Sequence, residues 1–132
     1  MQVNSEPTAN GRWIATRTSK EFCVWETGTW RVLSRWPARP EEQDSGSIIS
    51  SKDSRLLATD AADGAFVLRE LPHGTELVRL IPPHSLAARE WLFSPDSNRL
   101  IIVTRNGQVV EWDLAELRRE LAKLKLDWKI SR

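Results

Sequence analysis

The chain has 132 residues, of which 40% are hydrophobic and 28% charged, the composition of an ordinary folded domain. Its 19 basic and 18 acidic side chains give a formal net charge of +1, which excludes an overall field that would attract nucleic acid or an anionic membrane. Cys23 is the only cysteine, so an intrachain disulfide and a thiolate metal cluster are excluded as well.

The first seven residues have neither the basic start nor the apolar stretch of a signal peptide. No run along the chain approaches the roughly 18 apolar residues that a membrane-spanning helix needs. We therefore expect a soluble, cytoplasmic protein without membrane contact.

Short apolar runs recur along the chain at a nearly constant distance. Arg12, Arg55 and Arg99 each follow a polar turn and open such a run, and they lie 43 and 44 residues apart. A second run follows in each unit, at residues 23–26, 67–70 and 110–113. A recurrence of this length indicates one supersecondary unit copied three times.

The runs have the composition of β-strands, since they are rich in β-branched and aromatic residues and are bounded by turn formers. Asp63-Gly64 and Asn106-Gly107 separate the two runs of units two and three and favour tight hairpins. Further strands are expected at residues 3–5, 30–33, 48–50, 76–81 and 91–94. Four short antiparallel strands in about 43 residues are typical of a propeller blade.

Two stretches between the units are expected to be irregular. Residues 35–46 hold two prolines and several acidic side chains, which predicts an exposed loop between blades. Residues 81–85, with Pro82-Pro83, form the equivalent junction before the third unit.

A helix is expected where the third unit should have its last strand. Leucines 114, 117, 121 and 124 follow one another at helical spacing and share one face. Asp113 can cap the helix, with Glu116 three residues later completing a capping box.

The sequence thus predicts an all-β fold, a partial propeller of three four-stranded antiparallel blades with the last one incomplete. Within a single domain, blade 1 covers about residues 1–40, blade 2 about 46–82, blade 3 about 84–113 and the C-terminal helix about 114–125.

Residues 93–101 and 106–114 together resemble a unit of the WD-repeat β-propeller family, with Trp112-Asp113 at the place of its name-giving dipeptide. In that family a His, a Ser or Thr, an Asp and the Trp form a hydrogen-bonded tetrad. The resemblance implies tetrad-like structural roles for His84, Thr104, Asn106, Trp112, Asp63 and Trp25. The match is incomplete, because Asn106, Arg69 and Ser19 stand where the family has Asp, Trp and Asp.

Residues 117–128 are similar to segments that end the WD-repeat region of large bacterial proteins, some of which carry a serine/threonine kinase domain upstream. This similarity implies the C-terminal end of a longer propeller, and it transfers no catalytic residue.

Three blades cover only part of a ring, because propellers typically close with four to eight. The outer faces of the first and last blade therefore require a cover. The C-terminal helix, a second copy of the chain, or upstream blades could each supply it.

No catalytic or cofactor site is expected. His73, His84 and Cys23 lack metal-ligand spacing, and neither a nucleophile elbow nor a glycine-rich phosphate loop is present. The seven tryptophans and the mixed-charge C-terminal segment do not favour nucleic-acid binding, since repeat-matched aromatics usually pack inside the fold.

We therefore expect a non-catalytic scaffold for protein–protein interaction, with an unidentified protein partner. Its candidate contacts are Trp30, Trp36, Arg39, Glu41 and Pro83. One alternative is the regulatory propeller tail of a bacterial kinase or another multidomain enzyme. A decayed remnant without function is the other.

Overall fold

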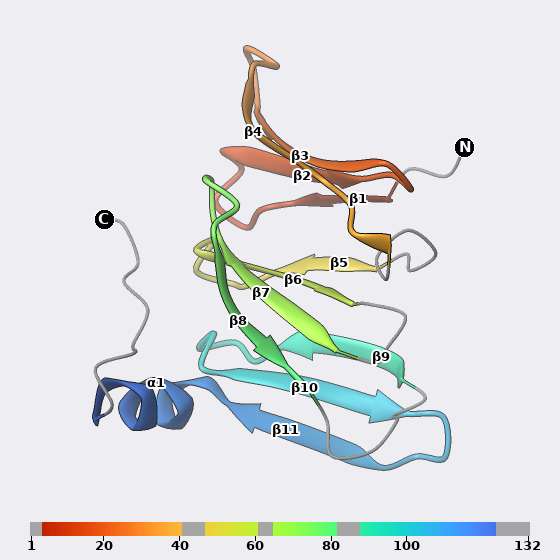
Figure 1. Ribbon diagram of the computed structural model, residues 1–132, viewed down its shortest axis with the longest axis vertical. Helices are drawn as coiled ribbons and strands as arrows, with labels where there is room; N and C mark the ends of the chain where they lie inside the picture. The colour runs from red at the N-terminus through yellow and green to blue at the C-terminus, as the bar shows by residue number, and fades with distance from the viewer. Residues whose placement is uncertain (1–3, 41–46, 61–64, 82–87, 124–132) are drawn as a thin grey trace. The chain divides into compact units, whose positions relative to one another are not determined.

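The computed structural model describes residues 4–40, 47–60, 65–81 and 88–123, which form three antiparallel sheets and one helix (Figure 1). The chain divides into two compact units, residues 1–85 and 86–132. The predicted all-β class with a C-terminal helix is confirmed, as is the incomplete third sheet.

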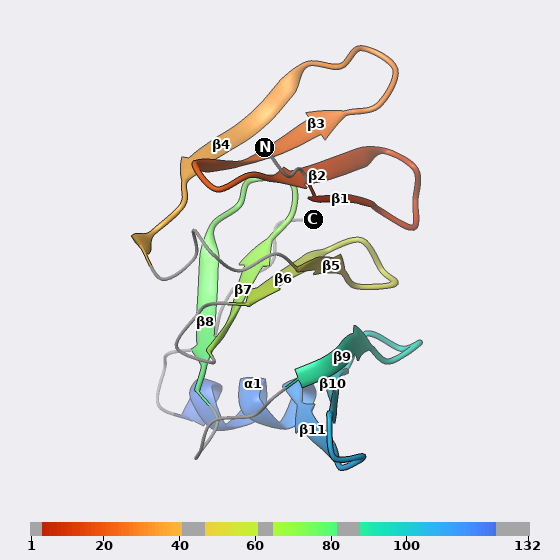
Figure 2. The same cartoon turned by 90° about the vertical axis from the view of Figure 1, so that its right-hand side faces the viewer.

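Unit 1 contains two sheets of four strands, each in sequential order. The first sheet consists of β1 (Asn4–Pro7), β2 (Trp13–Arg17), β3 (Glu21–Glu26) and β4 (Val32–Pro37). The second consists of β5 (Ile48–Ser50), β6 (Leu56–Asp60), β7 (Phe66–Glu70) and β8 (Glu76–Leu80). The first strands of the two sheets, β1 and β5, lie side by side (Figure 2).

Unit 2 contains a sheet of three strands followed by the helix α1 (Leu114–Lys123). Its strands are β9 (Ala88–Phe93), β10 (Arg99–Thr104) and β11 (Val109–Asp113). The predicted cap is present, since Asp113 Oδ1 accepts a hydrogen bond from the Glu116 amide at 2.9 Å. Residues 124 and 125, the predicted end of the helix, lie outside the described residues.

The strand β4 differs from its predicted position. It was expected at residues 30–33 and followed by a loop from residue 35, but it begins at Val32 and continues to Pro37. The proline is tolerated because β4 is an edge strand, where a missing amide donor breaks no ladder bond.

One hydrogen-bonded turn connects the first two strands of every sheet. In the second sheet, the Ser51 hydroxyl donates to Asp53 Oδ1 at 2.5 Å and accepts from the Leu56 amide at 3.0 Å. Thr8 with Asn10 and Ser94 with Asp96 repeat this arrangement. The fourth residue of each turn has a left-handed backbone, with φ of 73°, 62° and 63° at Gly11, Ser54 and Ser97.

These turns show that Arg99 stands one residue after the position that corresponds to Arg12 and Arg55. The carbonyls of Arg12, Arg55 and Asn98 occupy equivalent places, accepting from the amides of Thr27, Leu71 and Leu114. Arg99 therefore corresponds to Trp13 and Leu56, as the strand pairing also shows. The three turns recur at a constant distance of 43 residues. The repeats differ in length by one residue, and this difference lies in the hairpins between the second and third strands of the sheets.

The core of unit 1 lies between its two sheets. Its buried members are Ala15, Phe22, Val24, Ile48, Leu57 and Leu71. Beside them Trp36 stacks on Phe22, with ring centroids 5.4 Å apart, and the guanidinium of Arg69 lies 4.8 Å from the Trp36 ring. Burial of apolar side chains and the contact of Trp36 with Arg69 together hold the sheets against each other.

Polar contacts also join the two sheets of unit 1. The buried Arg17 forms an ion pair with Asp60 at 3.0 Å and donates to the Ser47 carbonyl at 2.6 Å. The Ser34 hydroxyl donates to the Pro72 carbonyl at 2.6 Å.

None of the described helices is of a length and apolarity suited to crossing a membrane.

Candidate functional site

The turn between β3 and β4 presents the most exposed tryptophan of unit 1. Trp30 is 58% exposed, and its backbone is left-handed, with φ of 58°. Its amide donates to the Glu26 carbonyl at 2.9 Å, while the Glu26 amide donates to the Arg31 carbonyl at the same distance. The turn projects beyond the rest of unit 1, at the top of Figure 1.

The second sheet has glycine at the equivalent position. The Gly74 amide donates to the Glu70 carbonyl at 2.7 Å, and its φ is 78°. A β-carbon there would lie 2.3 Å from the ring of Trp36, so only glycine fits. Trp30 therefore occupies a place that the repeat fills with glycine, at a backbone strain of about 1–3 kcal/mol for a residue with a side chain. The turn itself does not require tryptophan.

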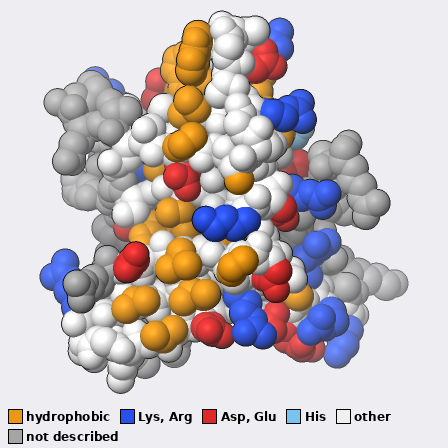
Figure 3. Space-filling view, turned by 180° about the vertical axis from the view of Figure 1, so that it is seen from behind, with side chains coloured by type: hydrophobic (Ala, Val, Ile, Leu, Met, Phe, Trp, Pro, Cys, Tyr) orange, Lys and Arg blue, Asp and Glu red, His pale blue; other side chains and the backbone are white. Residues whose placement is uncertain are grey.

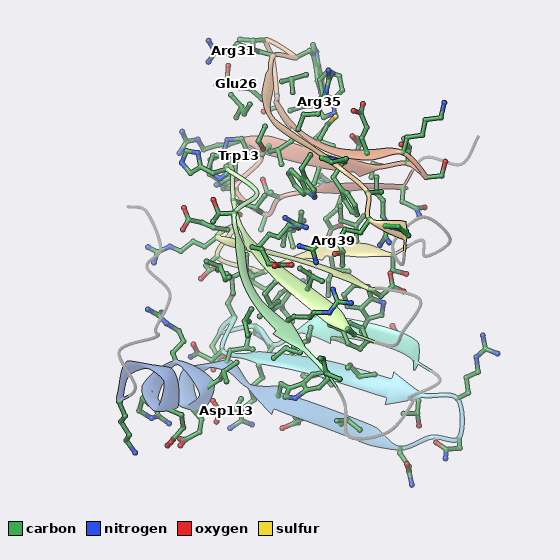
Figure 4. All side chains as sticks on the ribbon, viewed as in Figure 1. Trp13, Glu26, Arg31, Arg35, Arg39 and Asp113 are labelled. Atoms are coloured by element: carbon green, nitrogen blue, oxygen red, sulfur yellow. The ribbon has the colours of Figure 1, made fainter. Side chains whose placement is uncertain are left out.

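Charged and polar groups surround Trp30. Glu26 accepts a hydrogen bond from the Thr29 hydroxyl at 2.7 Å and pairs with Arg31 at 3.5 Å. The Thr29 hydrogen bond and then the positive charge of Arg31 lower the pKa of Glu26, although desolvation opposes them. Figure 4 shows Glu26 and Arg31 close together at this turn.

The neighbouring turn between β1 and β2 extends this surface. The Thr27 amide donates to the Arg12 carbonyl at 3.0 Å, which holds the two turns together. The Arg12 guanidinium lies 5.1 Å from the ring of Trp13, a cation–π contact. We call the group of Arg12, Glu26, Thr29, Trp30 and Arg31 the rim surface.

Of the other predicted contacts, Trp36 is half-buried in unit 1. Its half-buried ring is held between Phe22 and Arg69 and so is already used in joining the two sheets. Arg39 pairs with Glu76 at 2.9 Å. Glu41 and Pro83 lie outside the described residues.

Four of the six tetrad-like residues, Trp25, Thr104, Asn106 and Trp112, lie among the described residues. The Trp25 indole donates to Thr16 Oγ1 at 3.0 Å across β2 and β3. Thr104 donates to the Asn106 side chain and accepts from the Gln108 amide at 3.0 Å, so these two residues stabilise the β10–β11 hairpin.

The remaining tetrad-like residues complete this comparison. Trp112 pairs with Leu100 as Trp25 pairs with Ile14. Asp63 and His84 lie outside the described residues. The sequence analysis did not identify Thr16. The signal was available, because Thr16 and Trp25 lie on neighbouring strands of a short hairpin, where side chains on one face are close enough to interact.

One face of the third sheet carries exposed aliphatic side chains. Val109 is 61% exposed and Leu92 39%, and Ile101 and Val103 lie between them in the strand register. Arg99 and Glu111 on this face pair with each other at 3.5 Å. Figure 3 shows that exposed apolar side chains stand beside acidic and basic ones on the surface of the chain.

Within the described ranges, no group of three or more His, Cys, Asp or Glu side chains is placed to hold a metal ion. Cys23 is buried in β3.

Neither a family profile nor a curated protein matches the chain. Among solved structures, the chain is similar to one described as "Structure of Dos1 propeller", with a TM-score of 0.65 and 13% sequence identity. The similarity covers 84% of this chain and 30% of that chain, so this chain spans less than a third of its length. Together with the three antiparallel sheets, it shows that the chain has a β-propeller-like fold.

Proposed function

We propose that the chain is a non-catalytic protein-interaction scaffold that binds a protein partner through the rim surface. The observation that carries this proposal is Trp30, an exposed indole on a strained backbone where the repeat has Gly74. Strain of this kind is typical of residues retained for binding or switching rather than for stability.

The chemistry of the rim surface suits a protein partner. Tryptophan and arginine are the residues most enriched among energetic hot spots of protein interfaces, and Trp30 lies next to Arg31. Hydrogen bonds of Glu26 fix the turn before any partner arrives, which reduces the entropy that binding would cost.

We further propose the WD-repeat family and a place within a longer protein, for instance as the regulatory tail of a bacterial kinase. The hydrogen bond from Trp25 to Thr16 supports the family, because the WD-repeat tetrad joins the same residue types. The span of 30% of the matched propeller supports a longer protein.

The test replaces Trp30 by glycine, the residue of the equivalent turn. We expect Trp30→Gly to fold with unchanged or higher stability, by up to about 1 kcal/mol, because the left-handed strain is relieved. Binding of the partner should weaken about tenfold or more, as for a hot-spot residue.

The measurement is affinity purification of the tagged chain from the cells that make it, followed by titration of the partner recovered. Ile81→Gly is the matched control, since Ile81 is an apolar side chain of 69% exposure outside the rim surface. A partner bound equally by the wild-type chain and Trp30→Gly would contradict the proposal.

A further inference from the structure

Resting on the proposal that Trp30 binds a protein, we infer that its partner is a second copy of this chain. The sheet β9–β11 of one copy docks against the outer side of the sheet β1–β4 of the other. The inference comes from comparing, position by position, the contact between the two sheets of unit 1 with the surfaces that the chain leaves exposed.

Within unit 1, three residues form a layered contact between the sheets. Trp36 of β4 stacks on Phe22 of the same sheet and covers Gly74 of the next one. Phe22 is fully buried in this contact. Gly74 lacks a side chain, which leaves room for the indole of Trp36.

In the third sheet, Val109 occupies the position equivalent to Phe22, but no tryptophan of the described residues stacks on it. Val109 pairs with Val103 as Phe22 pairs with Arg17, so the two residues are equivalent. Val109 is 61% exposed. In the described part of unit 2, α1 follows β11 directly, and the sheet has no fourth strand that would supply a tryptophan equivalent to Trp36.

In the first sheet, Trp30 occupies the position equivalent to Gly74, and its indole is the kind of ring that the third sheet lacks. Trp30 and Gly74 share the same turn hydrogen bond and the same left-handed backbone. If the third sheet of one copy meets the first sheet of another as sheets one and two meet, the indole of Trp30 fills the place of Trp36 against Val109. One explanation thus covers the strained tryptophan and the exposed valine.

The polar contacts change in a compatible way. In unit 1, Glu6 accepts a hydrogen bond from the Ser50 amide at 2.7 Å. At the equivalent positions the third sheet has Leu92, and the first sheet has Pro7, which has no amide donor. A hydrogen-bonded pair is therefore replaced on both sides by apolar groups, and neither side is left with an unpaired donor or acceptor.

The charges on these faces are also accounted for. Val103 stands at the place of Arg17, so the contact between copies needs no counterpart of the Arg17–Asp60 ion pair. Arg99 and Glu111 enter the contact already paired with each other. Glu90, opposite Val103 on the same face, is exposed and must keep its access to water in the docked state, because an unpaired buried charge would oppose docking.

Each copy carries both surfaces, so two copies can form the contact twice and close into a dimer. A closed dimer contains six sheets, three from each copy.

The test is the mass of the purified chain by sedimentation over a range of concentrations. We expect a dimer for the wild-type chain, and monomers for Trp30→Gly and for Val109→Lys. Ile81→Lys, which places the same charge at another exposed aliphatic position, should remain a dimer. Circular dichroism and cooperative thermal unfolding establish that each variant is folded.

Mixing the two monomeric variants tests the arrangement itself. A pair of Trp30→Gly with Val109→Lys retains one intact contact, because the second chain supplies Trp30 and the first supplies Val109. Pairs should therefore form in the mixture at concentrations where neither variant pairs alone. Absence of pairs would overturn the head-to-tail docking.

A wild-type monomer at every concentration, or a dimer that survives Trp30→Gly, overturns the inference. The proposed function is judged separately, by whether any protein, a second copy or another chain, loses binding when Trp30 is replaced by glycine. A monomer that still binds such a protein would preserve the proposed function and refute the pairing of copies.

Discussion

At the scale of single residues, three hydroxyl groups stabilise the turn between the first two strands of each sheet. Thr8, Ser51 and Ser94 each bond to a side chain two residues later and to an amide five residues later. Their sequence pattern of Ser or Thr, any residue, then Asp or Asn is a recognised turn former. The sequence indicated turns here, but the shared register appeared only when the backbone bonds were compared.

Asp96 gives this turn a measurable pH dependence. Hydrogen bonds from the Ser94 hydroxyl and the Asn98 amide lower the pKa of Asp96 from its ordinary value of 3.8, although desolvation opposes them. The folded chain therefore binds a proton less readily than the unfolded one. Its contribution to stability is complete above pH 3.8 and is lost as the pH falls through the lowered pKa.

We expect carboxyl titration by NMR to give Asp96 a pKa below 3.8 in the folded chain. In Ser94→Ala, which removes the hydroxyl donor, the pKa of Asp96 should return toward that value. An unshifted pKa in the wild-type chain would contradict the hydrogen-bond geometry at this turn.

At the scale of strands and helices, local signals were sufficient and long-range ones were not. The helix and its Asp113 cap were predicted correctly because both depend on residues within one or two turns of chain. Trp36 was predicted as a surface contact, and the sequence did not indicate that its ring packs on Phe22 and on Arg69 of another sheet. Such packing joins residues far apart in sequence, which no local pattern reveals.

Gly74 provides a test of the contact between the sheets of unit 1. We expect Gly74→Ala to lower the free energy of unfolding by about 2–4 kcal/mol, from left-handed strain and from overpacking against Trp36. Gly28→Ala is the matched control, because its φ is 91° but no atom lies within 4 Å of the added carbon.

The control should show only the strain, about 1 kcal/mol. Urea unfolding curves of the two variants provide the comparison. Equal losses would mean that Trp36 does not pack on Gly74.

At the scale of the whole molecule, the repeat could be predicted but the use of its surfaces could not. Period and strand composition indicated three successive sheets, which the structure confirms. The equivalence of Trp30 with Gly74 relates two unlike residue types, and only their backbone reveals it. For this reason the sequence suggested Trp30 as a contact without indicating what it would meet.

The inferred contact between copies has a characteristic response to salt. Leu92 and Pro7 stand where the contact within unit 1 has a hydrogen bond between Glu6 and Ser50. Arg99 and Glu111 are paired with each other within one copy. We therefore expect the dimer to persist, or to tighten, when salt is raised, since screening weakens only charge attraction between exposed groups. Sedimentation at low and high sodium chloride measures this, and dissociation at high salt would contradict an apolar contact.

The strict 43-residue recurrence of the strand-connecting turns has a practical consequence for engineering. The one-residue difference between the repeats lies in the β-hairpins, where the Thr18 amide bonds to the Glu21 carbonyl but the Thr104 amide bonds to the Gln108 carbonyl. Natural variation in length has thus been accommodated at this end of the sheets. Foreign peptides grafted into the β2–β3 hairpin should be displayed without disturbing the β3–β4 turn at the other end of the same sheet, where Trp30 lies.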